Sequence, residues 1–530
     1  MDSILEHQLK LLQNHGTHLL LRGVLHGIEK EGLRVDASGT LSLSPHPKQL
    51  GAPLTNSSIT TDFSESLLEL ITPVFTNPAA ALNFLKTVHQ FTYSSMGEEF
   101  IWAASMPCRI PDPSLIPIAQ YGESNMGQMK HVYRVGLAHR YGKMMQSIAG
   151  IHYNFSIPDE FWRAYQELEK NQETFESFRS SSYFRMIRNF RRHSWLLLYL
   201  FGASPAVSRS FLQEKRHNLQ TLYTDTLYLP YATSLRMSGL GYSTTAQASL
   251  NICFNHLKTY IQSLTKAIHT PYPLYEEIGV KVDGRYRQLS TTILQIENEY
   301  YSDVRPKRVP RGEETPLQAL KKRGVEYIEV RNTDINPLLP VGIDLHQAIF
   351  LDTFLISCLL MGDAFMTSGE CKRINENLRN VTTRGREPGL DLLCLNGTIK
   401  LKEAGSQLIR QFELTAELLD QLHNTSMYSQ AVKIQSEKLH TSSLTPSAQV
   451  FDALRTSGLE YTQWTLNMSK EHKETLQTSA QDDEVLKSLA LQSKASVAEL
   501  QEIEASDNMD FDEFLHLYRT GEPNNPPVSG

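Results

Sequence analysis

The stretch GIEKEGLRV, residues 27–35, constrains the fold most, because it reads as a β-strand that carries two carboxylates on one face. Side chains alternate between faces along a strand, so Glu29 and Glu31 point the same way with Cα atoms about 7 Å apart. Two negative charges at this spacing repel each other unless a cation or water separates them. On a solvated edge the pair carries no function, whereas in a pocket it predicts a metal site.

Two other predicted strands also carry chemical groups on a single face. In GIHYNFSI, the polar residues His152, Asn154 and Ser156 alternate with apolar ones, which is the period of two expected of a half-buried strand. In VEYIEVR, Glu329 and Arg331 share one face. The sequence therefore predicts an imidazole, a carboxylate and a guanidinium on sheet faces.

Acidic residues recur in two further segments. The segment TTDFSESLLELITP places Asp62 seven residues before Glu69, and Glu69 stands alone in an apolar run. A lone carboxylate in apolar surroundings is costly unless a charged group meets it. The stretch ILQIENEYY predicts a strand with four side chains on one face: Gln295, Glu297, Glu299 and Tyr301.

Any one of these strands is explained by a half-exposed sheet with its polar face in water. Five such segments in one region favour a sheet that turns its acids to a common space: Glu29, Glu31, Asp62, Glu69, His152 and Glu329. Five carboxylates and one imidazole suit Mg²⁺, with Mn²⁺ as the alternative, better than zinc. An arginine next to an acidic metal site, such as Arg331, is explained if a phosphoryl group is transferred between the metal and the guanidinium, because both stabilise its negative charge.

The order of the predicted elements favours an α+β fold. From about residue 20 to 335, strand-like runs alternate with helices without a regular β-α-β rhythm, which indicates a mixed or antiparallel sheet. From about 345 onward the pattern is helical. We expect a catalytic domain over 1–410, a helical C-terminal extension packed on it over 411–520, and a flexible tail over 521–530. Asp352 interrupts the most apolar run, which predicts a buried helix and not a membrane span.

Composition narrows the function classes. The chain has 530 residues and a net charge of −7, and this balance gives no sign of a nucleic-acid-binding protein. Its five cysteines are scattered, which favours a reducing cytoplasm over a disulfide framework. There is neither a P-loop nor a Rossmann motif. The basic run RPKR, Arg305 to Arg308, is best explained as a solvated loop, with contact to nucleotide phosphates as the alternative.

Several motifs together resemble those of the bacterial glutamate–cysteine ligases. They are GIEKEGLRV, TTDFSESLLELITP, SMPC, AQYG, GIHYNFS, YLFGASPA, YLPYATSLR, LQIENEYY, RPKR and EYIEVRNTDINP, in register from about residue 20 to 400. The resemblance implies a glutamine-synthetase-like fold, in which a curved antiparallel sheet forms a funnel with helices outside. It also implies the ATP- and Mg²⁺-dependent first step of glutathione synthesis, in which L-glutamate and L-cysteine give γ-glutamylcysteine, ADP and phosphate.

The same resemblance assigns roles to individual residues. The five acids and the imidazole named above match the metal-site motifs, and Arg331 matches the arginine at the transferred phosphate. Arg236 is implied both in catalysis and in substrate binding. The remaining amino-acid pocket matches Tyr133, Arg134, Tyr242 and Tyr301, with Phe63, Leu137 and Gln146 as lining residues. Asn154 and Asn298 are expected near the nucleotide.

Other functions are compatible with part of this pattern. A related carboxylate–amine ligase that uses another amine, or a phosphotransferase of similar fold, would share the metal and phosphate residues. A non-catalytic metal-binding regulatory or scaffold protein would keep the acids, but the presence of Arg331 with all six argues against it. We expect a monomeric cytoplasmic enzyme that acts on small molecules, with no nucleic-acid or membrane partner.

Overall fold

A seven-stranded antiparallel sheet lies at the centre of the computed structural model, which describes residues 4–213, 216–241, 245–248, 250, 252–312 and 314–520. The strands lie in the order β11 (Val304–Lys307), β12 (Tyr327–Thr333), β5 (Ile151–Ser156), β1 (Leu25–Val35), β3 (Leu67–Ile71) and β2 (Ile59–Thr61), and β4 (Phe100–Ile101) also pairs with β1. All of these pairings are antiparallel. Within the described residues the sheet is open, because β11 and β2 do not pair with each other. The predicted antiparallel α+β fold is confirmed.

Three helices cover one face of this sheet: α2 (Pro78–Ser95), α5 (Phe175–Phe201) and α11 (Leu345–Leu360). They meet the side chains that alternate with the predicted functional ones. Lys30 of β1 contacts His89 of α2, and Tyr153 of β5 donates a hydrogen bond to Asp352 of α11. The opposite face, which carries Glu29, Glu31 and His152, is therefore the one left for a site.

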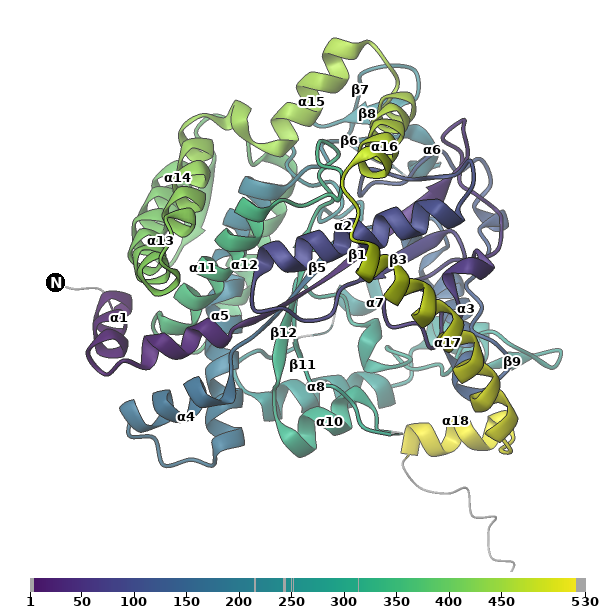
Figure 1. Ribbon diagram of the computed structural model, residues 1–530, viewed down its shortest axis with the longest axis horizontal. Coiled ribbons are helices and arrows are strands. Elements are labelled where there is room, and N and C mark those ends of the chain that lie inside the picture. The colour runs from purple at the N-terminus through teal and green to yellow at the C-terminus, as the bar shows by residue number, and fades with distance from the viewer. Residues whose placement is uncertain are drawn as a thin grey trace, which may run out of the picture.

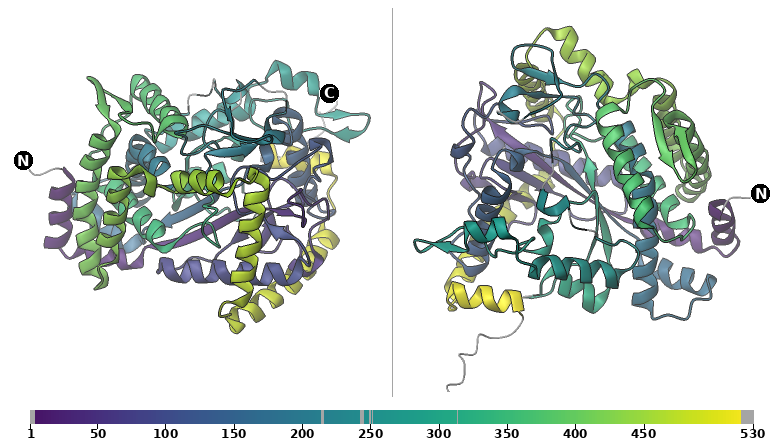
Figure 2. Two further views of the ribbon diagram at one scale, coloured as in Figure 1. Left: turned by 90° about the horizontal axis from the view of Figure 1, so that it is seen from above. Right: turned by 180° about the vertical axis from the view of Figure 1, so that it is seen from behind.

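The remaining elements surround this core. Three small antiparallel sheets are formed by β6 (Ala206–Ser208), β7 (Gln220–Thr221) and β8 (Thr226–Tyr228), by β9 (Lys281–Val282) and β10 (Arg285–Tyr286), and by β13 (Asp391–Cys394) and β14 (Gly397–Lys400). The other helices before residue 400 are α1 (Ile4–Asn14), α3 (Asn125–Tyr141), α4 (Asp159–Leu168), α6 (Arg209–Leu212), α7 (Thr245–Ala248), α8 (Leu257–His269), α9 (Pro273–Ile278), α10 (Pro316–Arg323) and α12 (Ser368–Arg384). Figures 1 and 2 show helices around the strands, with α1 and the last helix at opposite ends of the molecule.

The C-terminal region is helical, as the sequence predicts. It consists of α13 (Leu401–His423), α14 (Met427–His440), α15 (Pro446–Ser457), α16 (Tyr461–Thr478), α17 (Asp483–Ser506) and α18 (Phe511–Thr520). These helices pack on the sheet-bearing part: Ser496 of α17 accepts a hydrogen bond from Ala52 N, and Asp507 accepts one from the Asn125 amide of α3. Helix α13 continues across residue 410, and a domain division there stays a prediction. The predicted tail, 521–530, lies outside the described residues.

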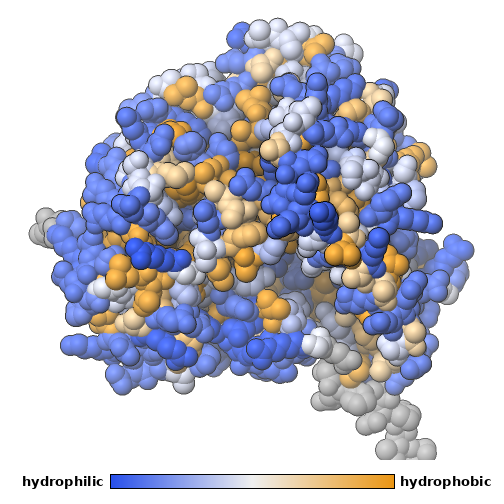
Figure 3. Space-filling view, in the orientation of Figure 1, coloured by the Kyte–Doolittle hydropathy of each residue, from blue (hydrophilic) through white to orange (hydrophobic). Residues whose placement is uncertain are grey.

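Helix α11 is buried inside the molecule, as its interrupted apolar run predicts. Asp352 is 2% exposed and forms an ion pair with His26 of β1 at 2.9 Å between Oδ2 and Nε2. In the described part of the chain, no helix is both long enough and apolar enough to cross a membrane. In Figure 3, hydrophilic residues dominate the visible face and hydrophobic ones form separate groups between them, which is typical of amphipathic helices around a core.

Candidate active site

The strand registers bring the predicted acids together on one face. Glu29 of β1 pairs with His152 of β5, and Glu31 of β1 pairs with Glu69 of β3. Glu329 of β12 pairs with Asn154 of β5, two residues from His152 and on the same face of that strand. Because all these strands are neighbours, acids that are 300 residues apart in sequence meet across three strands.

His152 lies at the centre of this cluster. Its Nδ1 is 3.2 Å from Glu29 Oε2 and 3.7 Å from Glu329 Oε1, and its Nε2 is 3.6 Å from Glu31 Oε1. One ligand atom each from Glu29, His152 and Glu329 lies within 4.8 Å of the other two. Asn154 holds Glu29 in place through a hydrogen bond of 2.7 Å from Nδ2 to Oε1.

The cluster faces a cavity of about 230 Å³. The lining residues are Glu29, Glu31, Asp62, Phe63, Glu69, Tyr133, Arg134, Leu137, Gln146, His152, Asn298, Tyr301, Arg305, Lys307, Glu329 and Arg331. Helix α3 contributes Tyr133, Arg134 and Leu137 as one wall, and strands β11 and β12 contribute the basic residues opposite. All six predicted metal-site residues and most of the predicted amino-acid pocket therefore line one cavity.

Two basic side chains contact the acid cluster at Glu329. Arg331 Nη1 is 3.0 Å from Glu329 Oε1, and Lys307 Nζ is 3.3 Å from the other oxygen, Oε2. Arg331 Nη1 is also 3.4 Å from His152 Nδ1. Arg305 is 8% exposed and donates a hydrogen bond of 2.9 Å to Asn298 O. The cavity thus has an acidic side and a basic side that share one carboxylate.

The pKa shifts follow this division. Burial alone would raise the pKa of Glu329, but the charges of Arg331 and Lys307 hold it well below its ordinary value. Burial raises the pKa of Glu69 well above the usual range, and the neighbouring Glu29, Asp62 and Glu31 add to this effect. Burial also raises the pKa of Glu31. The positive charges near Glu31 and Glu69, among them that of Arg331, therefore do not outweigh the effect of burial and of the neighbouring acids.

These residues fit a hard divalent cation. The donor set is five carboxylates and one imidazole, which are ligands that Mg²⁺ and Mn²⁺ accept. Asn154 Oδ1 is buried beside Glu29 and has no hydrogen-bond partner among the described residues. A cation in the cluster would lower the repulsion that raises the pKa values of Glu31 and Glu69.

Two predicted site residues that the structure describes do not line the cavity. Arg236 is 2% exposed and lies behind it, where Nη2 donates a hydrogen bond of 2.9 Å to Arg331 O and Nη1 is 3.8 Å from Asp334 Oδ1. Asn154 contacts Glu29 and not the cavity itself. Tyr242 lies outside the described residues.

The predicted strand over ILQIENEYY is wrong. Residues 297–299 form a 3-10 helix, because the Glu299 carboxylate turns back to accept a hydrogen bond from Gln295 N at 2.7 Å. Glu299 then points away from the cavity to Arg140, and Glu297 Oε1 accepts a hydrogen bond from Leu317 N. The four side chains therefore do not share one face, and Tyr301 alone of them lines the cavity.

The preferred interpretation of RPKR as a solvated loop is also wrong. Residues 304–307 form strand β11 at the edge of the sheet, where Pro306 is tolerated because one side of an edge strand needs no partner. Arg305 and Lys307 point to the cavity, and they are the site residues that the sequence interpretation missed. Their alternation on either side of Pro306 was the available signal, since residues two apart share a strand face.

An acid cluster next to basic residues, in one cavity of an open antiparallel sheet, is suited to an ATP-dependent ligase, which needs a divalent cation and fixed positive charge at the transferred phosphate. The chain belongs to the glutamate–cysteine ligase family. The glutamate–cysteine ligase family model matches residues 9–381. The glutamate–cysteine ligase of Pseudomonas putida is 49% identical over 98% of both chains, and that of Hahella chejuensis is 49% identical over 94% of this chain and 96% of its own.

Solved structures agree with this assignment. A crystal structure of the glutamate–cysteine ligase of Francisella tularensis in complex with AMP has a TM-score of 0.88 and 37% identity, covering 94% of this chain and 98% of its own. A bifunctional glutathione synthetase from Pasteurella multocida has a TM-score of 0.70 at 24% identity, covering 97% of this chain and 58% of its own. This second likeness concerns the fold alone.

Proposed function

We propose that this chain joins the γ-carboxylate of L-glutamate to the amine of L-cysteine with ATP, and that it does so in the cavity described above. The products are γ-glutamylcysteine, ADP and phosphate, which is the first step of glutathione synthesis. Membership of the glutamate–cysteine ligase family supports this reaction. The complex of the Francisella tularensis relative with AMP supports nucleotide binding.

One observation carries the assignment of the reaction to this cavity. Glu329 contacts His152 of the acid cluster on one side and Arg331 and Lys307 on the other. A triphosphate needs both kinds of group at once, because its charge is shared between a divalent cation and fixed positive side chains during transfer. This cavity supplies both kinds of group, and they meet at Glu329.

The residues that would hold the divalent cation are Glu29, Glu31, Asp62, Glu69, His152 and Glu329. When bound, Mg²⁺, or Mn²⁺ as the alternative, offsets the negative charge of the triphosphate. Arg331 stabilises the transferred phosphoryl group, and Arg236 fixes the Arg331 backbone from behind through its hydrogen bond to Arg331 O. Lys307 and Arg305 add positive charge on the same side.

The opposite wall suits an amino acid. Tyr133, Arg134, Gln146 and Tyr301 offer hydroxyl, guanidinium and amide groups, while Phe63 and Leu137 add apolar surface. The glutamate γ-carboxylate oxygen attacks the γ-phosphorus of ATP, and the bond to ADP breaks. The cysteine nitrogen then attacks the acyl carbon, loses a proton, and phosphate leaves. The aromatic rings keep water from hydrolysing the acyl phosphate.

The reaction is tested by supplying amines one at a time. Purified protein is incubated with ATP, Mg²⁺ and glutamate, together with cysteine, alanine, glycine or ammonia, while ADP and the peptide product are measured. We expect ADP release that matches γ-glutamylcysteine formation and depends on cysteine. Faster ADP release and peptide formation with another amine than with cysteine would replace this function by that of a ligase for that amine.

The site is tested by Glu329→Gln, which keeps the size of the side chain and removes the charge that joins the two halves of the cavity. We expect turnover to fall at least about 100-fold, the typical loss when one charged contact at the reacting phosphate is removed. The matched control is Glu326→Gln, whose side chain is 43% exposed and pairs with Arg308. Full activity of Glu329→Gln would remove this carboxylate from the site.

A further inference from the structure

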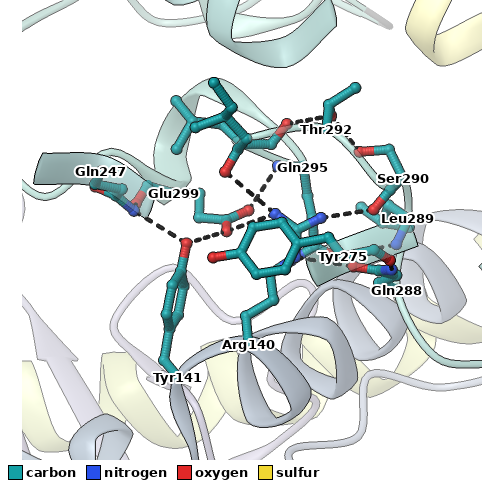
Figure 4. Close-up of polar contacts among 12 residues, drawn as sticks. Arg140, Tyr141, Gln247, Tyr275, Gln288, Leu289, Ser290, Thr292, Gln295 and Glu299 are labelled. Carbon is teal, nitrogen blue, oxygen red and sulfur yellow. Dashed lines mark hydrogen bonds and ion pairs between the residues drawn. The ribbon is translucent and has the colours of Figure 1, made fainter. Parts of the chain in front are cut away.

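A buried ion pair lies outside the cavity, at the end of helix α3, and no step of the proposed reaction uses it. Arg140 Nη1 is 2.9 Å from Glu299 Oε1, and both side chains are 0% exposed. Figure 4 shows this pair at the centre of a network that joins α3 to the irregular segment 288–299 and to Gln247 of α7. Burying both charges of an ion pair away from water costs free energy. The contacts around this pair show which segments it holds in place.

The network fixes the segment on both sides of the pair. Arg140 donates to Gln288 Oε1 at 3.0 Å and to Ser290 O at 2.6 Å, while Glu299 accepts from Gln295 N at 2.7 Å. Gln295 in turn donates to Tyr133 O of α3 at 3.2 Å. The segment is thereby docked on the same helix that forms one wall of the cavity.

The network ends at Tyr301, which lines the cavity. Tyr141 donates a hydrogen bond to Glu299 Oε1 at 2.6 Å and accepts one from Gln247 Nε2 at 3.2 Å. The other end of that amide, Gln247 Oε1, accepts from Tyr301 N at 3.0 Å. The ring of Tyr141 meets the ring of Tyr301 edge to face, with 5.9 Å between centroids, and Gln146 donates to the Tyr301 hydroxyl at 2.8 Å.

The Tyr141 hydroxyl is suited to this role. Burial and the charge of Glu299 raise the pKa of Tyr141, so the hydroxyl keeps the proton that it donates to Glu299. Gln247 also donates to Glu299 O at 2.9 Å, so a single amide bridges the two residues on either side of Tyr300. Gln247 therefore sets the backbone around Tyr301 from outside the cavity, while Arg305, which lines the cavity, also donates a hydrogen bond to Asn298 O in the same segment.

We infer that Arg140, Glu299, Tyr141 and Gln247 form a positioning unit that holds the Tyr301 side chain in the orientation required to bind an amino-acid substrate. This role rests on the proposed function, since it assigns the Tyr301 wall to glutamate or cysteine. The unit acts through placement of Tyr301, while β11 and β12, which form the phosphate side of the cavity, are held by their pairing within the sheet.

The test is Tyr141→Phe, which removes the hydroxyl and keeps the ring that packs on Tyr301. The KM of at least one amino-acid substrate rises about fivefold, the effect of one hydrogen bond, while the KM of ATP changes less than about twofold. The control is Tyr461→Phe, which removes a buried hydroxyl that donates to Met106 O and leaves every KM unchanged. A merely structural loss would lower kcat through fewer active molecules and leave each KM unchanged.

A second measurement asks whether the effect passes through Tyr301. In a Tyr301→Phe background, adding Tyr141→Phe changes the amino-acid KM by less than about twofold, because the group that it positions is already absent. Independent, multiplying effects of the two substitutions would overturn the inference. If Tyr141→Phe does not fold, Gln247→Met is measured instead and is expected to give the same pattern. Absence of γ-glutamylcysteine formation by the unmodified protein refutes the proposed function, whereas an active protein with unchanged KM values in the variants refutes only the positioning role.

Discussion

Glu31 and Glu69 lie directly opposite each other on the adjacent antiparallel strands β1 and β3. Like charges in this arrangement destabilise a sheet. Burial raises the pKa of Glu69, and the charges of Glu29, Asp62 and Glu31 raise it further. The pair therefore costs stability in the absence of a cation, a cost that the proposed role of these carboxylates in holding a divalent cation would explain.

This repulsion predicts that Glu69→Gln stabilises the metal-free protein. A raised carboxyl pKa gives a penalty that is absent below the unfolded value and grows as pH rises, so the gain is larger at pH 7.5 than at pH 4.5. We expect about 1 kcal/mol from urea unfolding in EDTA, together with a smaller thermal shift on adding Mg²⁺. Glu98→Gln, on an exposed turn, is the control. Lower stability of Glu69→Gln in EDTA would contradict the repulsion.

Lys307 predicts a specific effect on ATP. Its Nζ is 3.3 Å from Glu329 Oε2 at the basic side of the cavity. Lys307→Met removes one charge that would meet a phosphate, so the KM of ATP rises about tenfold, the equivalent of one charge-assisted hydrogen bond. Steady-state kinetics with each substrate varied in turn measure this. Lys322→Met, 61% exposed on α10, serves as the control, and an unchanged KM of ATP in Lys307→Met would place Lys307 outside the phosphate contacts.

Gly150 is predicted to tolerate no side chain. Its N donates a hydrogen bond of 2.6 Å to Glu31 Oε2, and a Cβ at this position would collide with the Arg236 guanidinium. Gly150→Ala displaces Arg236 from Arg331 O, so we expect a stability loss of about 1–3 kcal/mol and a turnover loss of at least about tenfold. Gly239→Ala adds a Cβ in open space and is the control. Wild-type activity and stability of Gly150→Ala would show that Arg236 adjusts freely.

The ion pair of His26 with Asp352 predicts a pH dependence of stability. Burial alone lowers the pKa of His26, but the charge of Asp352 and their hydrogen bond outweigh it and raise that pKa above its ordinary value. This contribution is fully present below about pH 6.5, the unfolded value, and is lost as pH rises through the folded value. Asp352→Asn therefore destabilises the protein more at pH 5.5 than at pH 9.

Urea unfolding at both pH values measures this difference. The control, Ser357→Ala, removes a hydrogen bond of 2.8 Å from the same helix to Thr415, without a titrating group. Its stability loss is expected to be the same at both pH values. An equal loss at both pH values for Asp352→Asn would show that His26 is neutral in the folded protein.

Local periodicity was enough to predict most of the acid cluster. Residues two apart on a strand share a face whatever the sheet does, so Glu29 with Glu31, and Glu329 with Arg331, could be paired from the sequence. The apolar residues between them, such as Ile328 and Val330, indicated which face was core. Family resemblance then added residues that no periodicity marks, of which Tyr133, Arg134 and Gln146 do line the cavity.

Which residues lie on a common strand face could thus be predicted before the fold was known, because alternation is a property of the local backbone. Tertiary structure alone decided which faces meet, since register depends on partners that are far apart in the chain. Tertiary structure also determines the position of Glu299. Its carboxylate binds Arg140, which lies 159 residues away in the sequence, and residues 297–299 form a 3-10 helix in place of the predicted strand. Such a choice depends on the desolvation and pairing of charges, which no local pattern encodes.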